Sequence, residues 1–440
     1  MLKRVGETPP LPSVPSAEAG FPAPFASSLE YSVPARGGWT IVHMGMLIPE
    51  AHEIFVCASA CLRGVVLSAA EMDLMDRFST VSIEEHNVLE GDMEALIVEG
   101  VADILQRLPK LPPAVLVYSS CIHHFVGCDL ALCYDMLRKR FPGVDFTDCY
   151  MTPTMRKSGL TPDQIMRRQL YSLLRPLPKD PRACAVIGNC FSLDESSDLV
   201  RMIRSAGFTL YQLPDMKTYA EYLETAKSSF CISTQSVARA GGDALEQRLG
   251  VRHLYLPVSY SSEEIRRNKA ELARALGIDP PEDAGEEAAV AAALDRARET
   301  LGDTPVVIDY TFTPRPLGLA RLLWEHGFRV TRLYLDSFSP EEREDLAWLR
   351  EHAPAIEVCP TVSPVMRKAR RGSPEKVLAI GQKAAYLSDT GYFVDLVENG
   401  GLYGFDGMRK LADLIEDAYL HEKDTETLIQ RKGWGCESCI

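Results

Sequence analysis

Residues 183–213 contain three consecutive patterns, ACAVIGN (183–189), DESSDLVRMIRSAG (194–207) and FTLYQL (208–213). The first and last are apolar runs of strand-forming residues. Between them, Leu199, Met202 and Ile203 recur at helical spacing and share one face. Gly207 then stands where a helix commonly ends in the left-handed conformation. The stretch therefore predicts a strand, an amphipathic helix and a second strand.

The same pattern recurs twice. One copy is PVVIDY (305–310), RPLGLARLLWEHG (315–327) and FRVTRLYLD (328–336), and another is AVLVYSS (114–120), DLALCYDMLRKRFPG (129–143) and VDFTDCY (144–150). Strands that read as continuous apolar runs and alternate with helices are typical of parallel sheets covered on both faces. We therefore expect an α/β protein with three doubly wound, Rossmann-like domains.

Composition shifts along the chain suggest where these domains begin and end. Residues 1–36 are rich in Pro, Ser and Ala and predict an extended, weakly ordered arm. We expect the α/β domains at 37–178, 179–300 and 301–440, the last with a C-terminal tail. The acidic, Ala-rich stretch 279–305 lies at the second boundary and predicts a surface helix.

The overall charge excludes some classes of function. The 440 residues carry a formal net charge of −14, whereas nucleic acids and anionic membranes are bound by basic faces. No apolar run reaches the ~18 residues of a membrane span, and the start has no signal-peptide core. We expect a cytoplasmic protein that binds neither nucleic acid nor membrane, and whose 12 cysteines are free thiols.

Several cysteines stand where this architecture collects ligands, beyond the carboxyl ends of strands. Cys121 directly follows the run AVLVYSS, and Cys190 directly follows AVIGN. Cys231 closes the short segment AKSSF (226–230), ahead of a predicted helix. This placement favours metal binding over simple packing for some of the thiols.

Cys57 and Cys61 form a C-x3-C pair in FVCASACLRG (55–64). On a helix the two thiols would share a face, and in a turn they would converge on one metal ion. Two buried thiols in an apolar helix are the alternative.

The segment CIHHFVGC (121–128) places two cysteines around two histidines. Cys121 is the better ligand candidate, whereas Cys128 is either a further ligand or part of the core. His123 and His124 would ligate a metal, donate hydrogen bonds to a cluster, or serve as polar residues near a helix N-terminus.

Two further groups remain open. The C-terminal pair Cys436 and Cys439 is either a metal site or a labile dithiol. The basic cluster of Arg367, Lys368, Arg370 and Arg371 is either a solvated charge cluster or a binding site for a ligand's carboxylates. Neither a phosphate-binding G-x4-G-K-[ST] loop nor a G-x-G-x-x-G fingerprint is present. The chain is therefore expected to receive its electrons from another molecule.

Four segments in this order resemble the nitrogenase component 1 family, over about residues 37–417. They are TIVHMGMLIPEAHEIFVCASACLRG (40–64), VYSSCIHHFVGCDL (117–130), SSFCISTQSVARAGGDALEQRLGV (228–251) and GGLYGFDGMRKLADLIED (400–417). The resemblance implies that Cys61 and Cys121 are ligands of an iron–sulfur cluster held between domains or subunits. It also implies that Cys231 anchors a second, catalytic cofactor.

The sequence departs from the family's pattern at two places. GYFVDLVENGG (391–401) lacks the histidine that precedes the family's C-terminal motif in dinitrogenase α chains, and no cysteine precedes Cys57. An ordinary iron–molybdenum cofactor and nitrogen fixation are therefore not expected. We expect a [4Fe–4S] cluster or a P-cluster-like double cubane, with Cys57 filling the third position.

The resemblance implies the catalytic component of a two-component, ATP-dependent reductase, fed by a partner iron–sulfur ATPase and acting on a small-molecule substrate as a homodimer or heterotetramer. The expected metal ligands are Cys57, Cys61, Cys121, Cys128 and Cys231, the expected catalytic residue is Cys231, and the expected cofactor-binding residues are Arg367, Lys368, Arg370 and Arg371. One alternative is a tetrapyrrole reductase whose basic cluster pairs with the ring's carboxylates. Another is a non-catalytic scaffold on which a complex iron–sulfur cofactor is assembled.

Overall fold

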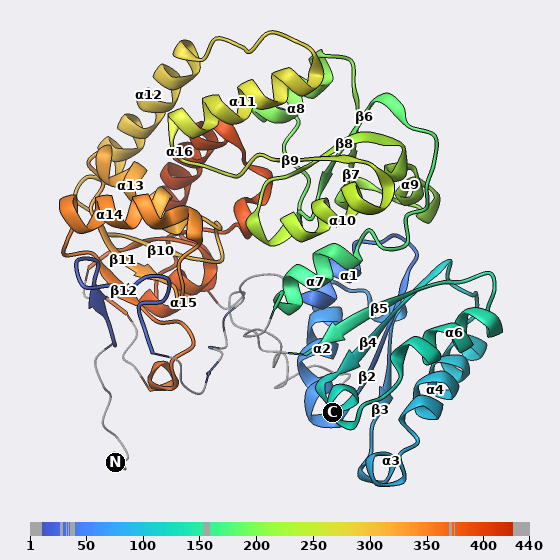
Figure 1. The fold of residues 1–440 in the computed structure, drawn as a ribbon. Helices are drawn as coiled ribbons and strands as arrows, with labels where there is room; N and C mark the ends of the chain where they lie inside the picture. The colour runs from blue at the N-terminus through green and yellow to red at the C-terminus, as the bar shows by residue number, and fades with distance from the viewer. Residues whose placement is uncertain are drawn as a thin grey trace. The chain divides into compact units, whose positions relative to one another are not determined.

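The structure, a computed structural model, describes residues 11–26, 30–31, 33, 35, 40–152, 159–368, 372–373 and 375–425. These residues form two compact units, coloured along the chain in Figure 1. The two-sheet unit comprises Trp39–Ser192 and Gly207–Pro257, and the one-sheet unit comprises Met1–Gly38, Leu193–Ala206 and Val258–Ile440.

The first sheet of the two-sheet unit has four parallel strands in the order β3-β2-β4-β5. They are β2 (His52–Cys57), β3 (Phe78–Ser82), β4 (Ala114–Ser120) and β5 (Asp145–Met151). The helices around this sheet are α1 (Ile41–Gly45), α2 (Ser59–Glu71), α3 (Glu85–Glu90), α4 (Met93–Arg107), α5 (Cys121–Val126), α6 (Leu130–Arg140) and α7 (Pro162–Gln169). The central strands β2 and β4 are buried along their whole length.

The two faces of the first sheet pack into different cores. On one face, Phe55 and Tyr118 stack with ring centroids 3.9 Å apart and contact the core that α1, α2 and α7 complete. On the other face, Ile54 and Val117 pack against apolar residues of α4 and α6. Because side chains alternate along a strand, this division separates neighbouring residues at the strand ends.

The second sheet of the same unit has the order β7-β6-β8-β9, again parallel. Its strands are β6 (Asp180–Ile187), β7 (Thr209–Gln212), β8 (Ser228–Ser233) and β9 (Arg252–Tyr255), and its helices are α9 (Tyr219–Glu224) and α10 (Arg239–Leu249). Short 3-10 turns lie at Met75–Arg77, Leu213–Asp215, Thr225–Lys227 and Ser236–Ala238.

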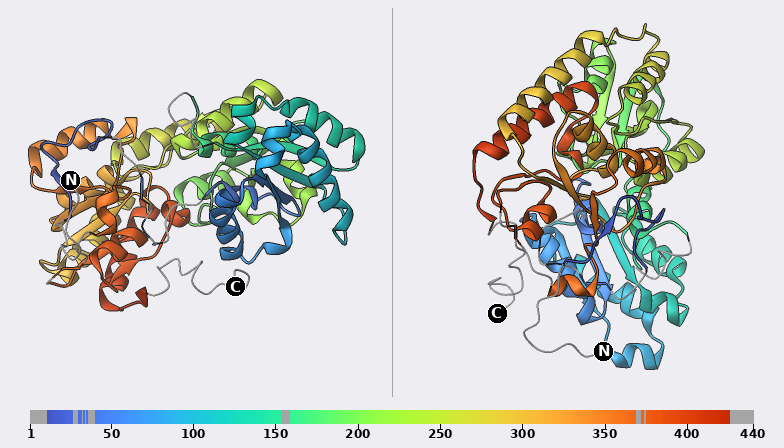
Figure 2. Two further views of the ribbon diagram at one scale, coloured as in Figure 1. Left: turned by 90° about the horizontal axis from the view of Figure 1, so that it is seen from below. Right: turned by 90° about the vertical axis from the view of Figure 1, so that its left-hand side faces the viewer.

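The one-sheet unit is built on a third sheet in the order β1-β12-β11-β10-β13-β14. Its strands are β1 (Val14–Pro15), β10 (Val306–Asp309), β11 (Val330–Tyr334), β12 (Glu357–Cys359), β13 (Leu378–Ile380) and β14 (Phe393–Val394). The helices are α8 (Asp198–Ser205), α11 (Ser262–Leu276), α12 (Ala284–Leu301), α13 (Pro316–Glu325), α14 (Arg343–His352), α15 (Gln382–Ser388) and α16 (Gly404–Leu420), with 3-10 turns at Pro340–Glu342, Pro364–Arg367 and Glu398–Gly401. Helices α12 and α16 run side by side, the yellow and red helices in the right-hand view of Figure 2.

The predicted fold class is confirmed, since the chain is an α/β protein whose sheets are parallel apart from the β1–β12 pair. The segment 194–207 forms α8 with Leu199, Met202 and Ile203 buried, and Gly207 follows it with φ +75°. The acidic stretch 279–305 contains α12, as predicted. The predicted domain limits at 37–178, 179–300 and 301–440 stay a prediction.

Part of the predicted N-terminal arm packs on the third sheet, and the arm's limits at 1–36 stay a prediction. Val14 and Pro15 pair antiparallel with β12, and the Ser16 hydroxyl donates to the carbonyl of Ala353 at 2.7 Å. Phe21 also stacks on Phe338 with centroids 6.1 Å apart. The arm therefore covers the exposed edge of the third sheet, where unpaired backbone groups would otherwise be open to other chains.

Among the described residues, no helix is long and apolar enough to cross a membrane.

Candidate functional site

The first sheet brings two predicted ligands to its centre. Cys57 is the last residue of β2, and Cys121 directly follows β4 as the first residue of α5. These two strands are neighbours, paired from His52 with Val115 to Val56 with Ser119. The chain leaves β2 for β3 on one side and β4 for β5 on the other, so the cysteines flank the switch point where open α/β sheets bind ligands.

Cys61 lies in the first turn of α2, beyond the same end of β2. Burial, with smaller contributions from the nearby Cys61 and Cys121 thiols, raises the pKa of the Cys57 thiol to about 12. The three sulfur atoms are therefore close enough to interact. Cys57 is fully buried, Cys121 is partly buried and Cys61 is exposed, so the group opens to the surface.

The donor set fits an iron–sulfur cluster. Thiolates are the ligands of such clusters and of other soft metal centres. Among the residues that the structure describes, no group of three or more His, Cys, Asp or Glu side chains is already arranged around a metal position. Cys57, Cys61 and Cys121 supply three thiols near the ends of β2 and β4, so a cluster with four thiolate ligands would take its remaining ligand from elsewhere. The assignment of Cys57, Cys61 and Cys121 as ligands stays a prediction.

His123 occupies a defined place behind these thiols. Its Nδ1 accepts a hydrogen bond from the Ser120 backbone N–H at 3.0 Å, and burial lowers the pKa of its ring. The neutral ring therefore carries its proton on Nε2, which is buried and has no partner. This leaves a donor on the side chain two residues after Cys121. His124 is exposed.

Cys128 lies on the other face of the first sheet. Whereas Cys57 belongs to the core formed with α1, α2 and α7, Cys128 packs on the core formed with α4 and α6. Burial raises the pKa of its thiol to about 12, and the nearby Cys133 and Glu94 side chains contribute to the rise. The structure therefore does not group Cys128 with Cys57, and its metal-binding role stays a prediction.

Cys231 is placed differently from the expectation that it ends a strand. It lies inside β8, which continues to Ser233, and its side chain is fully buried. Burial raises the pKa of its thiol above the ordinary range. The strand runs further than expected because Ile232 and Ser233 pair with both β6 and β9. The predicted catalytic and metal-binding roles of Cys231 are untested.

The basic cluster is described in part. Arg367 and Lys368 are exposed on the short 3-10 turn Pro364–Arg367 of the one-sheet unit and the residue after it. Arg370, Arg371, Cys436 and Cys439 lie outside the described residues. The cofactor-binding role of the four basic residues stays a prediction.

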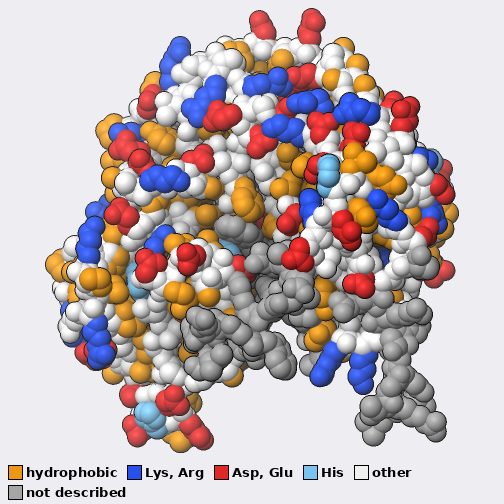
Figure 3. Space-filling model, turned by 180° about the vertical axis from the view of Figure 1, so that it is seen from behind, with side chains coloured by type: hydrophobic (Ala, Val, Ile, Leu, Met, Phe, Trp, Pro, Cys, Tyr) orange, Lys and Arg blue, Asp and Glu red, His pale blue; other side chains and the backbone are white. Residues whose placement is uncertain are grey.

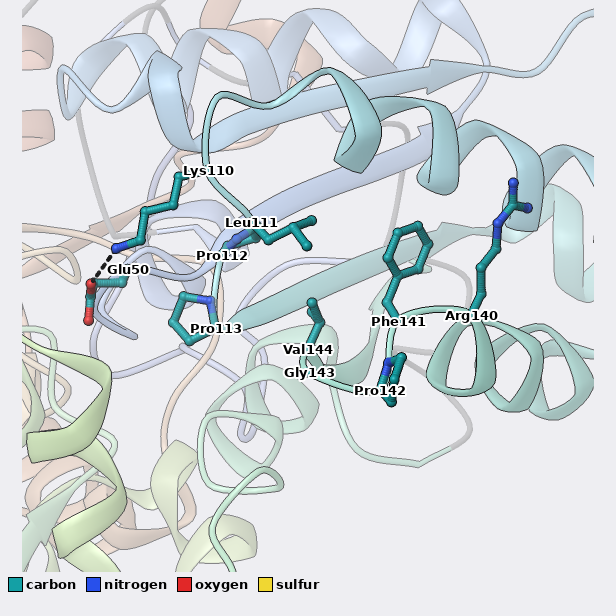
Figure 4. Close-up of a pocket in the computed structure, with 10 residues that line it drawn as sticks. All are labelled: Glu50, Lys110, Leu111, Pro112, Pro113, Arg140, Phe141, Pro142, Gly143 and Val144. Atoms are coloured by element: carbon teal, nitrogen blue, oxygen red, sulfur yellow. Dashed lines mark ion pairs between the residues drawn. The ribbon is translucent and has the colours of Figure 1, made fainter.

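A cavity of ≈ 340 Å³ lies at the opposite, amino-terminal end of the first sheet (Figure 4). Its floor is formed by the loops before β4 and β5, including Pro112, Pro113 and Phe141. Lys110 at its rim pairs with Glu50 at 3.8 Å, as Figure 4 shows. No predicted site residue lines this cavity, so it is separate from the cysteine site.

A polar chain that the sequence analysis missed ties the second sheet to α10. The Ser233 hydroxyl lies 2.7 Å from His253 Nε2, and His253 Nδ1 lies 2.9 Å from the Asp243 carboxylate. A Cβ on Gly242 would lie 2.3 Å from the His253 ring, so the ring needs a glycine there. The arrangement resembles a hydrolytic triad, but its serine is fully buried whereas its carboxylate is exposed. We therefore interpret it as a structural link between the second sheet and α10. No local sequence motif indicates it.

Charged side chains of both signs lie on the molecular surface. On the side drawn in Figure 3, acidic and basic side chains are interspersed among hydrophobic ones. Ion pairs between exposed side chains among the described residues include Arg296 with Asp413 at 2.5 Å.

Comparison with known proteins identifies one family and solved structures with a similar fold. The family of nitrogenase component 1 type oxidoreductases matches residues 43–419. A solved structure titled nitrogenase Cp1 at pH 6.5 is similar with a TM-score of 0.65 and 17% identity, over 90% of this chain and 94% of that one. Another, titled nitrogenase Cp1 at pH 5, gives a TM-score of 0.58 and 13% identity over 92% and 94%. At these identities the structures show a common fold, and no curated protein matches.

Proposed function

Because the chain belongs to the nitrogenase component 1 type oxidoreductases, we propose that it is the electron-accepting, catalytic component of a two-component reductase. A separate iron–sulfur ATPase would deliver single electrons of low potential. They would enter through a cluster at Cys57, Cys61 and Cys121 and pass to a small-molecule substrate. Such a complex would work in the cytoplasm, where thiols stay reduced.

The observation that carries this proposal is the placement of Cys57 and Cys121 at the switch point of the first sheet. Cys57 ends β2, Cys121 directly follows the neighbouring strand β4, and Cys61 stands one helical turn after Cys57. A cluster bound there would supply a one-electron redox centre. The fully buried Phe55 and Val56 lie just before Cys57, and an apolar shell of this kind keeps water away and helps to set a cluster's potential.

The surface beside Cys121 supports docking of a protein partner. Phe125 is 69% exposed and Val126 is 44% exposed, both on α5, and Leu132 on α6 is 49% exposed. Exposed apolar side chains that form a contiguous patch often mark an interaction surface. Since α5 begins with Cys121, a partner on this surface would come close to the thiols. The same surface suits a second subunit, so homodimer and heterotetramer both remain proposals.

Two other functions are compatible with the family. A tetrapyrrole reductase would use the exposed Arg367 and Lys368 on carboxylates of its substrate, and Cys231 would have no catalytic role. A scaffold for cofactor assembly would bind its cluster and then release it. No feature of the described residues favours either alternative specifically. We therefore favour the two-component reductase that acts on a small-molecule substrate.

An experiment with the anaerobically purified protein separates these functions. Mixed with an iron-protein ATPase, ATP and dithionite as the electron donor, a reductase should oxidise the ATPase repeatedly when a substrate is present, and dithionite should be consumed. A scaffold should instead lose iron to an acceptor protein, in a single round and without ATP hydrolysis. If the protein neither accepts electrons nor transfers iron, the proposed function is wrong.

A further inference from the structure

Two cysteines flank the N-terminus of α6 at positions that bring side chains together. Asp129 is the N-cap, and its side chain accepts a hydrogen bond from the Leu132 backbone N–H at 3.0 Å. Cys128 precedes this cap, and Cys133 is the fourth residue of the helix. In a capped helix these two positions form the hydrophobic staple, in which their side chains pack on each other. Here the staple consists of two thiols.

The surroundings of the pair are consistent with direct contact between the sulfur atoms. The Cys128 and Cys133 thiols lie close enough to influence each other's pKa, and both pack on the core with α4 and α6. Cys133 is fully buried, whereas Cys128 is partly exposed. An oxidant in solution therefore reaches Cys128 first and finds Cys133 directly behind it.

We propose that Cys128 and Cys133 are a redox-switchable dithiol, which a peroxide converts into a disulfide across the N-terminus of α6. In the first step the Cys128 sulfur attacks the peroxide, giving a sulfenic acid and one molecule of water. The Cys133 sulfur then displaces the hydroxyl group of the sulfenic acid, giving the disulfide and a second water. Two thiols are oxidised and one hydrogen peroxide is reduced, so the electrons balance.

Glu94 is the acidic side chain beside the pair, and its negative charge contributes to the raised pKa of the Cys128 thiol. Its carboxylate accepts a hydrogen bond from the Asp129 backbone N–H at 2.7 Å, which lowers its pKa, and it contacts the Cys128 thiol. Burial raises the pKa of the Cys128 thiol to about 12 and that of Cys133 to about 11. Both thiols are therefore protonated at neutral pH, and we expect the reaction to need excess peroxide.

The switch would act on the helix that carries Cys121. Gly127, with φ +72°, forms the link between α5 and Cys128. A disulfide would fix this link to α6 and withdraw Cys128 from any metal site. The proposal does not depend on the proposed function, because the pair exists whether or not a cluster is bound at Cys57.

Peptide mapping of the full-length protein tests the switch. The anaerobically purified chain is treated with excess hydrogen peroxide, alkylated with iodoacetamide and digested. We expect one peptide pair joined through Cys128 and Cys133, which dithiothreitol separates. The proposal is overturned if both cysteines are recovered alkylated, or if Cys128 is joined to any other cysteine.

Variants control for the loss of the pair through unfolding. In Cys133→Ser we expect Cys128 to stop at the sulfenic acid, which dimedone traps. Cys359→Ser, a fully buried thiol in the one-sheet unit, should leave the joined peptides unchanged. A Cys133→Ser protein in which Cys128 is still found in a disulfide would also contradict the proposal. Iron content measured on the same sample reports on the cluster independently.

Discussion

The first and third sheets each have a switch point between two central strands, but different side chains lie at the two switch points. In the first sheet, the switch point between β2 and β4 carries Cys57 and Cys121. In the third sheet, the switch point between β10 and β13 carries Asp309 and Gly381. The Asp309 carboxylate accepts hydrogen bonds from the backbone N–H groups of Thr311 at 2.7 Å and Ala384 at 2.6 Å.

This difference teaches which strand ends are available to a ligand. A Cβ on Gly381 would lie 2.3 Å from the Asp309 carboxylate, so that end is filled by the protein's own atoms. The thiols of the first sheet are not used in this way, and Cys61 is exposed beside them. The two sheets therefore share an architecture but differ at their switch points. The protein's own atoms fill the switch point of the third sheet, whereas that of the first sheet is open and carries thiols, which are soft metal ligands.

The largest expected effect is loss of iron from the open end alone. Cys121→Ala should lower the iron content of anaerobically purified protein to near zero, because it removes the central ligand. Asp309→Asn should leave the iron content unchanged if the protein is folded. Equal iron in Cys121→Ala and wild type would break the comparison.

A stability measurement should give the opposite result for the two ends. Asp309→Ala leaves two buried N–H groups without an acceptor, so we expect the free energy of unfolding to fall by about 3 kcal/mol. Metal-free Cys121→Ser should change it by about 1 kcal/mol or less. Urea unfolding followed by circular dichroism, which reports on the helices and strands of both units, provides the measurement.

Acid should affect the two units with opposite signs. Burial lowers the pKa of His52 on β2 to about 4, so between pH 4 and 6.5 the unfolded chain binds the extra proton and stability falls with decreasing pH. Burial raises the pKa of Asp309, so there the folded state binds the proton and stability rises with decreasing pH.

The effect of His52 should be about 2 kcal/mol between pH 7 and about pH 4.5. Hydrogen exchange of peptides from the first sheet, measured at both pH values, should show faster exchange in acid for wild type. His52→Gln should reduce this difference. Identical pH dependence in the two proteins would contradict the assignment.

The smallest effect on the isolated protein is expected at the apolar surface of α5. Phe125→Ala should change the free energy of unfolding by no more than about 0.5 kcal/mol, since the side chain is 69% exposed. It should nevertheless weaken binding of an iron-protein partner. Leu420→Ala, at a 58% exposed position in the one-sheet unit, is the matched control, and equal partner affinity in both variants would count against docking at α5.

The sequence alone predicted the parallel sheets and the position of Cys121, because both depend on local patterns. The run AVLVYSS is a buried strand, and the residue after it must lie at the carboxyl end. The position of Cys231 was misjudged because β8 extends by pairing with β6 and β9, which are distant in sequence. The face on which Cys128 lies depends on the packing of α4 and α6, which no single motif encodes.

The contact between Cys128 and Cys133 was predictable in principle. Asp129 is a residue typical of N-caps, and cysteines one position before the cap and four positions after it are brought together by staple geometry. The link of Ser233, His253 and Asp243 was not predictable, because its members come from two strands and a helix without a spacing motif.

The most direct test of the open end is the low-temperature electron paramagnetic resonance spectrum of the anaerobically purified, dithionite-reduced protein, with its iron and sulfide content. The proposed site predicts brown protein with iron and acid-labile sulfide in equal amounts and a cluster signal that Cys57→Ala, Cys61→Ala and Cys121→Ala each abolish or alter. Colourless, iron-free wild-type protein would contradict it, as would a cluster signal that is unchanged in all three variants.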